Sequence, residues 1–137
     1  MGLILDSSVL IAGERKGKNA RQALTEIAAQ AAGEDVAISV VTLIELAHCV
    51  ARANTLQRQS TRRQILNELI SALAVHPVTV PVALRTGLID GENSARGVRL
   101  ALSDLMIGVT ALELGYSVAT TNVLHFQMIP GLAVVSF

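Results

Sequence analysis

The chain has 137 residues, of which 51% are apolar and only 16% charged, and its formal net charge is zero. This length and composition fit one domain with a sizeable hydrophobic core and exclude a disordered chain. The neutral balance and the 2% aromatic content exclude a general attraction to nucleic acid and a base-stacking platform, so any nucleic-acid binding must be local.

Single polar residues interrupt the most apolar stretches. Asp6, Glu45 and Asp104 divide them, so no apolar run approaches the roughly 18 residues that a membrane-spanning helix needs. The N-terminus lacks the basic segment of a secretory signal, and the single cysteine, Cys49, excludes an internal disulfide. Together these features predict a cytoplasmic protein without a membrane partner.

Taken in chain order, the apolar pattern predicts strands that alternate with helices. A helix over 18–33 is expected to end at Gly33, and one over 102–115 at Gly115. Pro77 suits an edge strand, and Pro81 suits the first turn of a helix. The strands are expected at 3–6, 36–40, 75–80, 117–120 and 132–136, the helices at 18–33, 42–53, 60–74, 81–89 and 102–115, and loops at 91–97 and 121–131.

This alternation is typical of an α/β domain with a mainly parallel sheet covered by helices on both faces. No linker interrupts it, so we expect a single domain over residues 1–137.

Polar residues from distant parts of the chain are predicted to meet at one edge of this sheet. Asp6 and Asn122 follow strands, while Glu45 and Asp104 lie near the starts of helices. Parallel sheets place ligand sites beyond the carboxyl ends of their strands. Carboxylates gathered there repel one another, and Mg²⁺ or Mn²⁺ would relieve that repulsion. Glu113 gives the contrast, because it points away from Asp104 on the same predicted helix.

Each of these polar residues also has a purely structural interpretation. Asp6 could cap the turn after its strand, and Asn122 could be an ordinary turn residue. Glu45 stands three residues after Thr42, which is the spacing of a capping box. Asp104 could complement the dipole of its helix. Taken one at a time, each residue is better explained by a structural role than by a functional one. The prediction of a site depends on all four residues together.

Four stretches of the chain resemble the PIN-domain ribonucleases, and among them the VapC toxins of prokaryotic toxin–antitoxin pairs. The stretches, in order, are LILDSSVLIA, AISVVTLIELAHCV, ALSDLMIGVTALELG and VATTNVLHFQMIPGL. They extend over essentially the whole chain. The resemblance implies a small PIN-like α/β/α sandwich with a mainly parallel sheet, in agreement with the pattern above.

The resemblance also implies an activity and its residues. It implies an endoribonuclease that depends on Mg²⁺ or Mn²⁺, with the metal held by Asp6, Glu45 and Asp104 and with Ser8 beside Asp6. The fourth acidic position of the family falls on Asn122, whose neutral amide lowers the negative charge of the site by one. The implied partners are an RNA substrate, a cognate antitoxin and a second copy in a homodimer.

Two other functions stay open. The neutral residue at position 122 keeps possible a catalytically weak PIN-fold module that binds RNA or a protein. A phosphatase with an Asp nucleophile is disfavoured, because such enzymes usually carry a second Asp two residues later, where this chain has Ser8. Cations for a phosphate backbone would come from ERKGK, RQSTRR and ARGVR, and RQSTRR lies where VapC toxins use a helical hairpin to grip a partner.

Overall fold

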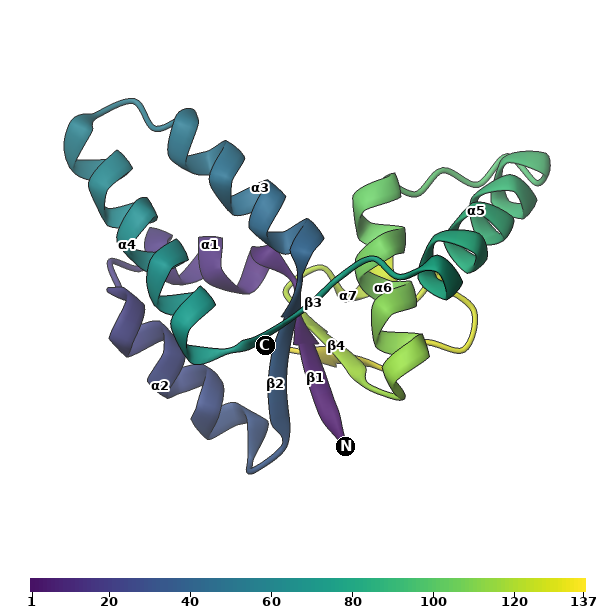
Figure 1. Cartoon of the computed structure of the whole chain (residues 1–137), viewed down its shortest axis with the longest axis horizontal. Helices are drawn as coiled ribbons and strands as arrows, with labels where there is room; N and C mark the ends of the chain where they lie inside the picture. The colour runs from purple at the N-terminus through teal and green to yellow at the C-terminus, as the bar shows by residue number, and fades with distance from the viewer.

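The computed structural model describes all residues, 1–137, and consists of a five-stranded sheet with helices on both faces (Figure 1). All strands run parallel, in the order β3-β2-β1-β4-β5, so the predicted α/β class is confirmed. The strands are β1 (Gly2–Leu5), β2 (Asp35–Ser39), β3 (Ala74–His76), β4 (Ser117–Thr120) and β5 (Val134–Ser136). The helices are α1 (Ser7–Arg15), α2 (Ala20–Ala31), α3 (Val40–Ala51), α4 (Leu56–Ala72), α5 (Val80–Ala95), α6 (Leu102–Leu114) and α7 (Val123–Phe126).

The central strand β1 explains why the chain begins with a continuous apolar run. Every residue of β1 is buried, and its side chains alternate between the two faces of the sheet. Ile4 packs in one hydrophobic cluster with Leu105 and Phe126, whereas Leu5 packs in the other with Ile38 and Leu69. The sheet therefore separates two cores.

Helices cover these two cores unequally. In Figure 1, α1 to α4 lie on one side of the sheet, and α5 and α6 lie on the other. The α3–α4 hairpin projects beyond the sheet on its own side, and α5 lies outside α6. None of the helices is both long and apolar enough to cross a membrane.

The structure corrects several of the expected elements. The strand expected over 75–80 ends at His76, and the helix expected over 60–74 already begins at Leu56. The segment after Asp6 forms α1, which the sequence analysis did not predict. The expected loop over 91–97 is wrong for its first five residues, because α5 continues through Gly91 to Ala95. The expected loop over 121–131 contains one helical turn, α7. Its last residue, Phe126, is fully buried and holds this segment against the hydrophobic core.

Two helix ends also differ from expectation. Helix α2 ends at Ala31 rather than at Gly33, because Ala32 itself adopts the left-handed conformation at φ 52°. Helix α3 begins at Val40, and the hydroxyl of Ser39 caps it by accepting from the Val41 N–H at 3.1 Å. Gly115 does end α6 in the left-handed conformation, as predicted.

The strand order determines where a ligand can bind. Connections from β1 lead to β2 and β3 on one side, and the chain then returns to β4 and β5 on the other side. In such sheets a crevice opens at the carboxyl ends of the strands where the direction reverses, here β1 and β4. Asp6 directly follows β1, and Asn122 lies two residues after β4.

Candidate active site

Asp6 is a buried carboxylate held by a neighbouring strand. It is only 5% exposed, and its backbone N–H donates to the Ala119 carbonyl of β4 at 3.0 Å. Its Oδ2 accepts a hydrogen bond of 2.9 Å from the hydroxyl of Thr120, at the end of β4. Although Asp6 occupies the N-cap position of α1, its side chain makes no capping hydrogen bond. The capping interpretation of Asp6 is therefore wrong for its side chain.

Thr120 is the centre of a small hydrogen-bond network that the sequence analysis missed. Its hydroxyl is fully buried and accepts from the Asn122 backbone N–H at 2.9 Å. The Ser8 hydroxyl lies 3.1 Å from it, and because the only Thr120 proton goes to Asp6, Ser8 must be the donor there. Ser8 in turn accepts from the Thr121 N–H at 3.1 Å. The network joins the ends of β1 and β4.

Glu45 comes from the second turn of α3 and faces Asp6. Its Oε1 accepts a hydrogen bond of 3.3 Å from the hydroxyl of Ser7, the first residue of α1. Thr42 does not cap α3; it is fully buried and donates to the Leu5 carbonyl at 3.3 Å. The capping-box interpretation of Glu45 is therefore wrong, and the residue has no local structural role of that kind.

Asp104 comes from the first turn of α6, where it is half-buried. Its Oδ2 lies 3.2 Å from Nε2 of His125 in α7, which is ion-pair distance when the imidazole is protonated. The angle is not that of a hydrogen bond, so Nε2 has no hydrogen-bond partner. Glu113, in contrast, is exposed and pairs with Arg85 at 3.3 Å, as expected for the solvent face of the same helix.

The charge of Asp6 acts on Glu45 and on Asp104, and the charge of Asp104 also acts on Glu45. Burial raises the pKa of Glu45, and the charges of Asp6 and Asp104 raise it further, while the Ser7 hydrogen bond lowers it. Burial also raises the pKa of Asp104, with an added contribution from Asp6 and an opposing one from His125. Carboxylates from the residue that follows β1, from α3 and from α6 therefore lie within electrostatic reach of one another at this edge of the sheet.

The structure places the Asn122 backbone in the network around Asp6 but leaves the Asn122 side chain without a hydrogen bond. The residue precedes α7, is exposed, and makes its one hydrogen bond in the network through its backbone. A contribution of the amide to the site stays a prediction.

The donor set suits a hard cation that retains water. No group of three or more His, Cys, Asp or Glu side chains is arranged so that it could hold a metal ion. Mg²⁺ does not need three such side chains, because it keeps several waters and binds through one or two carboxylates together with substrate phosphates. Asp6 raises the pKa of Glu45 and of Asp104, and a cation of this kind would neutralise that repulsion.

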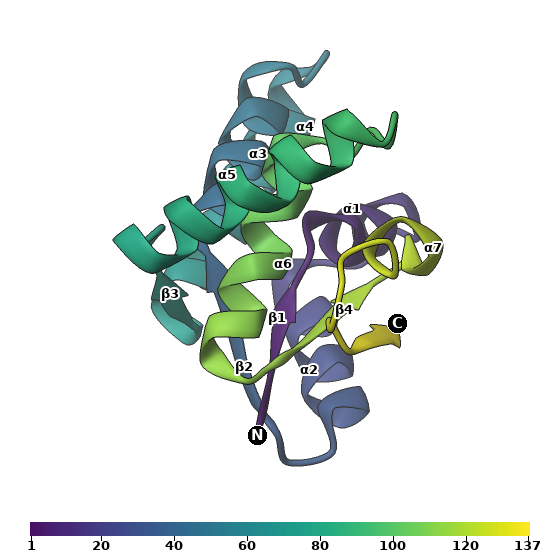
Figure 2. The same cartoon turned by 90° about the vertical axis from the view of Figure 1, so that its right-hand side faces the viewer.

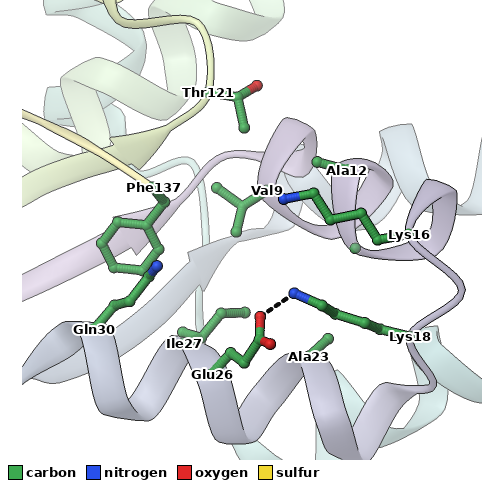
Figure 3. A pocket seen from close by; sticks show the side chains of 11 residues that line it. Val9, Ala12, Lys16, Lys18, Ala23, Glu26, Ile27, Gln30, Thr121 and Phe137 are labelled. Atoms are coloured by element: carbon green, nitrogen blue, oxygen red, sulfur yellow. Dashed lines mark hydrogen bonds and ion pairs between the residues drawn. The ribbon is translucent and has the colours of Figure 1, made fainter.

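A separate pocket between α1, α2 and the C-terminus is not part of this cleft. It has a volume of about 90 Å³ and a mixed lining, in which apolar residues such as Val9 and Phe137 lie beside charged ones such as Lys16 (Figure 3). At its mouth Lys18 pairs with Glu26. None of the converging carboxylates lines this pocket, so it is not where their chemistry would take place.

Comparison with protein families shows to which family the chain belongs. The model of the PIN domain matches residues 3–126. The chain belongs to the PIN domain family. Ribonuclease VapC10 of Mycobacterium tuberculosis is 33% identical to it over 126 residues, which cover 92% of this chain and 86% of that protein. Ribonuclease VapC1 of Rickettsia felis is 28% identical over 136 residues, which cover 99% and 96% of the two chains.

Solved structures agree on the fold of this PIN domain. The chain is similar to a VapBC2 structure from Rickettsia felis bound to a promoter DNA fragment, with a TM-score of 0.83 and 20% identity over 100% of this chain and 99% of that one. It is also similar to VapBC-5 from Mycobacterium tuberculosis, with a TM-score of 0.72 and 25% identity over 100% and 98%. The predicted PIN-like sandwich is thereby confirmed.

Proposed function

We propose that this PIN domain is a metal-dependent endoribonuclease and the toxin of a toxin–antitoxin pair. The observation that carries the proposal is the convergence of Asp6, Glu45 and Asp104, from three separate elements, on the crevice beyond β1 and β4. The VapC ribonucleases to which the chain is similar support RNA as the substrate. The proposal includes a cytoplasmic location, where RNA is available.

Asp6, Glu45 and Asp104 would hold the metal ion, which we propose to be Mg²⁺ or Mn²⁺. When bound, such an ion stabilises negative charge on a phosphate and lowers the pKa of a coordinated water. Oxygen-only donors favour these ions over zinc, which prefers nitrogen and sulfur.

The protein's own residues position this chemistry. The Thr120 hydroxyl donates a hydrogen bond to Asp6 Oδ2 and thereby fixes the orientation of that carboxylate after the end of β1. The Ser7 hydroxyl binds Oε1 of Glu45 and leaves Oε2 free. If Glu45 does not bind the ion, its free Oε2 would accept the proton of the attacking oxygen.

The partners follow from the same relationship. VapBC-5 of Mycobacterium tuberculosis is described as a member of the VapBC family of toxin–antitoxin systems, and VapBC2 of Rickettsia felis bears the same VapBC name, which supports a cognate antitoxin for this chain. We also propose a homodimer. Arg96 and Arg99, in the segment between α5 and α6 that leads to Asp104, are exposed and would contact the RNA backbone.

One observation favours a second function, that of a catalytically weak PIN module that binds RNA or a protein. The neutral, exposed side chain of Asn122 stands where the family has its fourth acid, which lowers the charge available for a second ion.

Brief induced expression of the chain without a partner separates the two functions. We expect growth arrest together with new, discrete cleavage ends in total RNA. Asp104→Asn should remove both effects, because it removes one charge from the cleft with little change of shape. Glu113→Gln is the matched control on the same helix and should stay toxic, since Glu113 faces solvent. Equal arrest by the wild type and by Asp104→Asn would contradict the catalytic proposal.

A further inference from the structure

The pocket between α1, α2 and the C-terminus has a floor of small residues. Ala12 and Gly13 of α1 and Ala23 of α2 line it, and the last two are buried. A side-chain carbon built on Gly13 would meet only Ala23, at an ordinary contact distance of 3.7 Å, and Gly13 has no positive φ. Alanine would therefore fit at position 13 and would favour the helix. Glycine enlarges the pocket there, although neither packing nor backbone conformation requires it.

The walls of this pocket carry an aromatic ring and positive charge. Figure 3 shows the ring of Phe137 on one side and the ammonium groups of Lys16 and Lys18 pointing inward from the other side. Lys18 pairs with Glu26, whereas Lys16 forms no ion pair with any carboxylate of the chain. Lys16 is therefore available to an anion, and a flat ring can stack on Phe137.

Hydrogen bonds join the rim of the pocket to the network around Asp6. Thr121 lines the pocket, and its N–H donates to the hydroxyl of Ser8 at 3.1 Å. The Phe137 N–H donates to the carbonyl of Thr120 at 3.2 Å, and the hydroxyl of Thr120 donates to Asp6. Figure 2 shows α1, α7 and the C-terminus on one side of the molecule, with α2 below them. The pocket therefore lies next to the crevice at the ends of β1 and β4.

We propose that this pocket binds one unpaired pyrimidine base of the RNA substrate, next to the phosphate that is cleaved. The Phe137 ring stacks on the base, and Lys16 binds a phosphate of the same strand. The inference rests on the proposed ribonuclease function and adds a substrate class, single-stranded RNA with a pyrimidine beside the cleavage site. One ring stacks one base, so the low aromatic content, which excludes a platform for several bases, does not oppose it.

The size of the pocket favours a single-ring base over a purine. Its volume is about 90 Å³, whereas an engineered cavity of about 150 Å³ binds benzene. One six-membered ring therefore enters with part of its edge left in the open mouth, and the fused rings of a purine do not fit. The Gln30 amide, which lies beside the Phe137 ring in Figure 3, offers both a donor and an acceptor to that edge.

The strand that enters the pocket must be single. In a duplex the bases are paired and stacked, and taking one out costs energy, whereas the bases of a loop or a single strand can be splayed out onto an aromatic side chain.

Charge favours a nucleotide over an apolar side chain of a protein partner. Of the charged side chains that line the pocket, Lys16 and Lys18 are cations, and Glu26 is the one anion. An apolar side chain brings no counter-charge for Lys16, whereas a nucleotide brings a phosphate together with its base.

Fluorescence anisotropy with labelled oligouridine and oligoadenosine of equal length tests the base and the ring. The full chain is titrated in chelator, where a metal-dependent nuclease leaves the RNA intact, and we expect oligouridine to bind several-fold more tightly. Phe137→Leu keeps an apolar side chain but loses the ring, so it should weaken oligouridine binding about fivefold or more. Val135→Ala, on exposed β5 outside the pocket, is the matched control. Equal affinities for the two RNAs, or equal losses in the two variants, would overturn the proposal.

The salt dependence of binding tests Lys16. Each phosphate contact on a single strand contributes about 0.7 to the slope of log K against log salt, so Lys16→Ala should reduce that slope by about 0.7. Arg15→Ala is the matched control, because Arg15 is the neighbouring exposed cation and does not line the pocket. The same reduction in both variants would mean that the basic segment attracts RNA without a specific contact, and Lys16 would lose its assigned role.

Gly13→Ala tests whether the base enters the pocket. Its methyl group should raise the melting temperature, because alanine favours the helix and has room there. The same methyl group occupies part of the floor, so binding of oligouridine should weaken several-fold. A higher melting temperature with unchanged affinity would show that the base stays outside, and would overturn the proposal.

Cleavage and capture separate this proposal from its alternatives. If the chain cleaves no RNA but still prefers oligouridine, the ribonuclease function is wrong and the pocket is supported. If it cleaves RNA without a pyrimidine beside the cleavage site, the pocket proposal is wrong and the ribonuclease function stands. A co-expressed antitoxin is the competing occupant. Loss of its capture in Phe137→Leu, with RNA binding unchanged, would assign the pocket to a protein side chain and overturn the proposal.

Discussion

Thr120 donates a hydrogen bond of 2.9 Å to Asp6, across the ends of two adjacent strands. Both residues are buried, and the Thr120 hydroxyl also accepts from Ser8 and from the Asn122 N–H. One hydroxyl therefore links β1, α1 and the start of α7. It orients a carboxylate that would otherwise be a poorly satisfied buried charge.

We predict that Thr120→Val lowers both stability and RNA cleavage, whereas Thr120→Ser retains both. Valine keeps the shape of threonine but leaves Asp6 Oδ2 and the Asn122 N–H without their partner, which should cost about 1–3 kcal/mol of unfolding free energy. RNA cleavage should fall roughly 10- to 100-fold, as for groups that orient metal-binding carboxylates. Urea melts and cleavage assays on both variants measure these effects.

The serine variant makes the Thr120 prediction specific, because it retains the hydroxyl and loses only a methyl group. A role of Thr120 in packing alone predicts similar losses for serine and valine. That result would contradict the positioning role.

We predict that the metal-free protein loses stability as pH rises from about 4 toward neutrality. The pKa values of Glu45 and Asp104 are raised above their ordinary values of 4.5 and 3.8. The folded protein therefore keeps protons that the unfolded chain has already released, and the free energy of unfolding falls with pH through this window and stays lower above it. Thermal melts in chelator across this range measure the slope.

Asp104→Asn should flatten that slope, because it removes one of the two groups and the charge that acts on Glu45. Glu113→Gln removes a carboxylate from the exposed face of the same helix and should leave the slope unchanged. If the two variants have the same slope as the wild type, repulsion in the cleft does not affect stability.

We predict that Mg²⁺ or Mn²⁺ raises the melting temperature and that Asp6→Asn abolishes the rise. An ion that binds only the folded state stabilises it by about 2.7 kcal/mol at a concentration 100 times its dissociation constant. Differential scanning calorimetry with and without the ion measures the shift, and Glu113→Gln should retain it. A full shift in Asp6→Asn would remove Asp6 from the metal site.

The sequence predicted the architecture well because strands buried on both faces leave an unambiguous apolar signal. The sheet and the burial of β1 follow from that signal and from the geometry of parallel strands, whereas the role of Asp6, Glu45 and Asp104 as a site stays a prediction. The missed elements have weaker signals. Helix α1 begins directly after Asp6 with two serines, and in α5 Gly91 suggested a turn where the helix in fact continues.

The hydrogen-bond network around Asp6 could not be predicted from the sequence. Ser7 and Thr120 are ordinary residues at the ends of elements, and only the register of β1 against β4 brings Thr120 to Asp6. Its position alone could have suggested a role for Thr120 in the site, because it is the last residue of a strand and lies two residues before Asn122. The partner of each hydroxyl depends on three-dimensional contacts that no local pattern encodes.

We predict that Asn122→Asp strengthens binding of Mn²⁺ with little change in metal-free stability. An amide offers one carbonyl oxygen and no charge, whereas aspartate adds a negative charge beside the cleft, and cation affinity rises with the charge of the ligands. Because residue 122 is exposed, solvent screens the added repulsion, and aspartate suits the position before α7 as well as asparagine does.

Calorimetric titration with Mn²⁺ measures the affinity of Asn122→Asp, and melts in chelator measure its metal-free stability. Asn67→Asp, on the exposed face of α4, is the matched control that adds the same charge far from Asp6. Tighter binding in Asn122→Asp but not in Asn67→Asp would show that position 122 reaches the ion. Equal affinities in the two variants and the wild type would mean that Asn122 contributes only its backbone to the network, and that the site consists of three carboxylates.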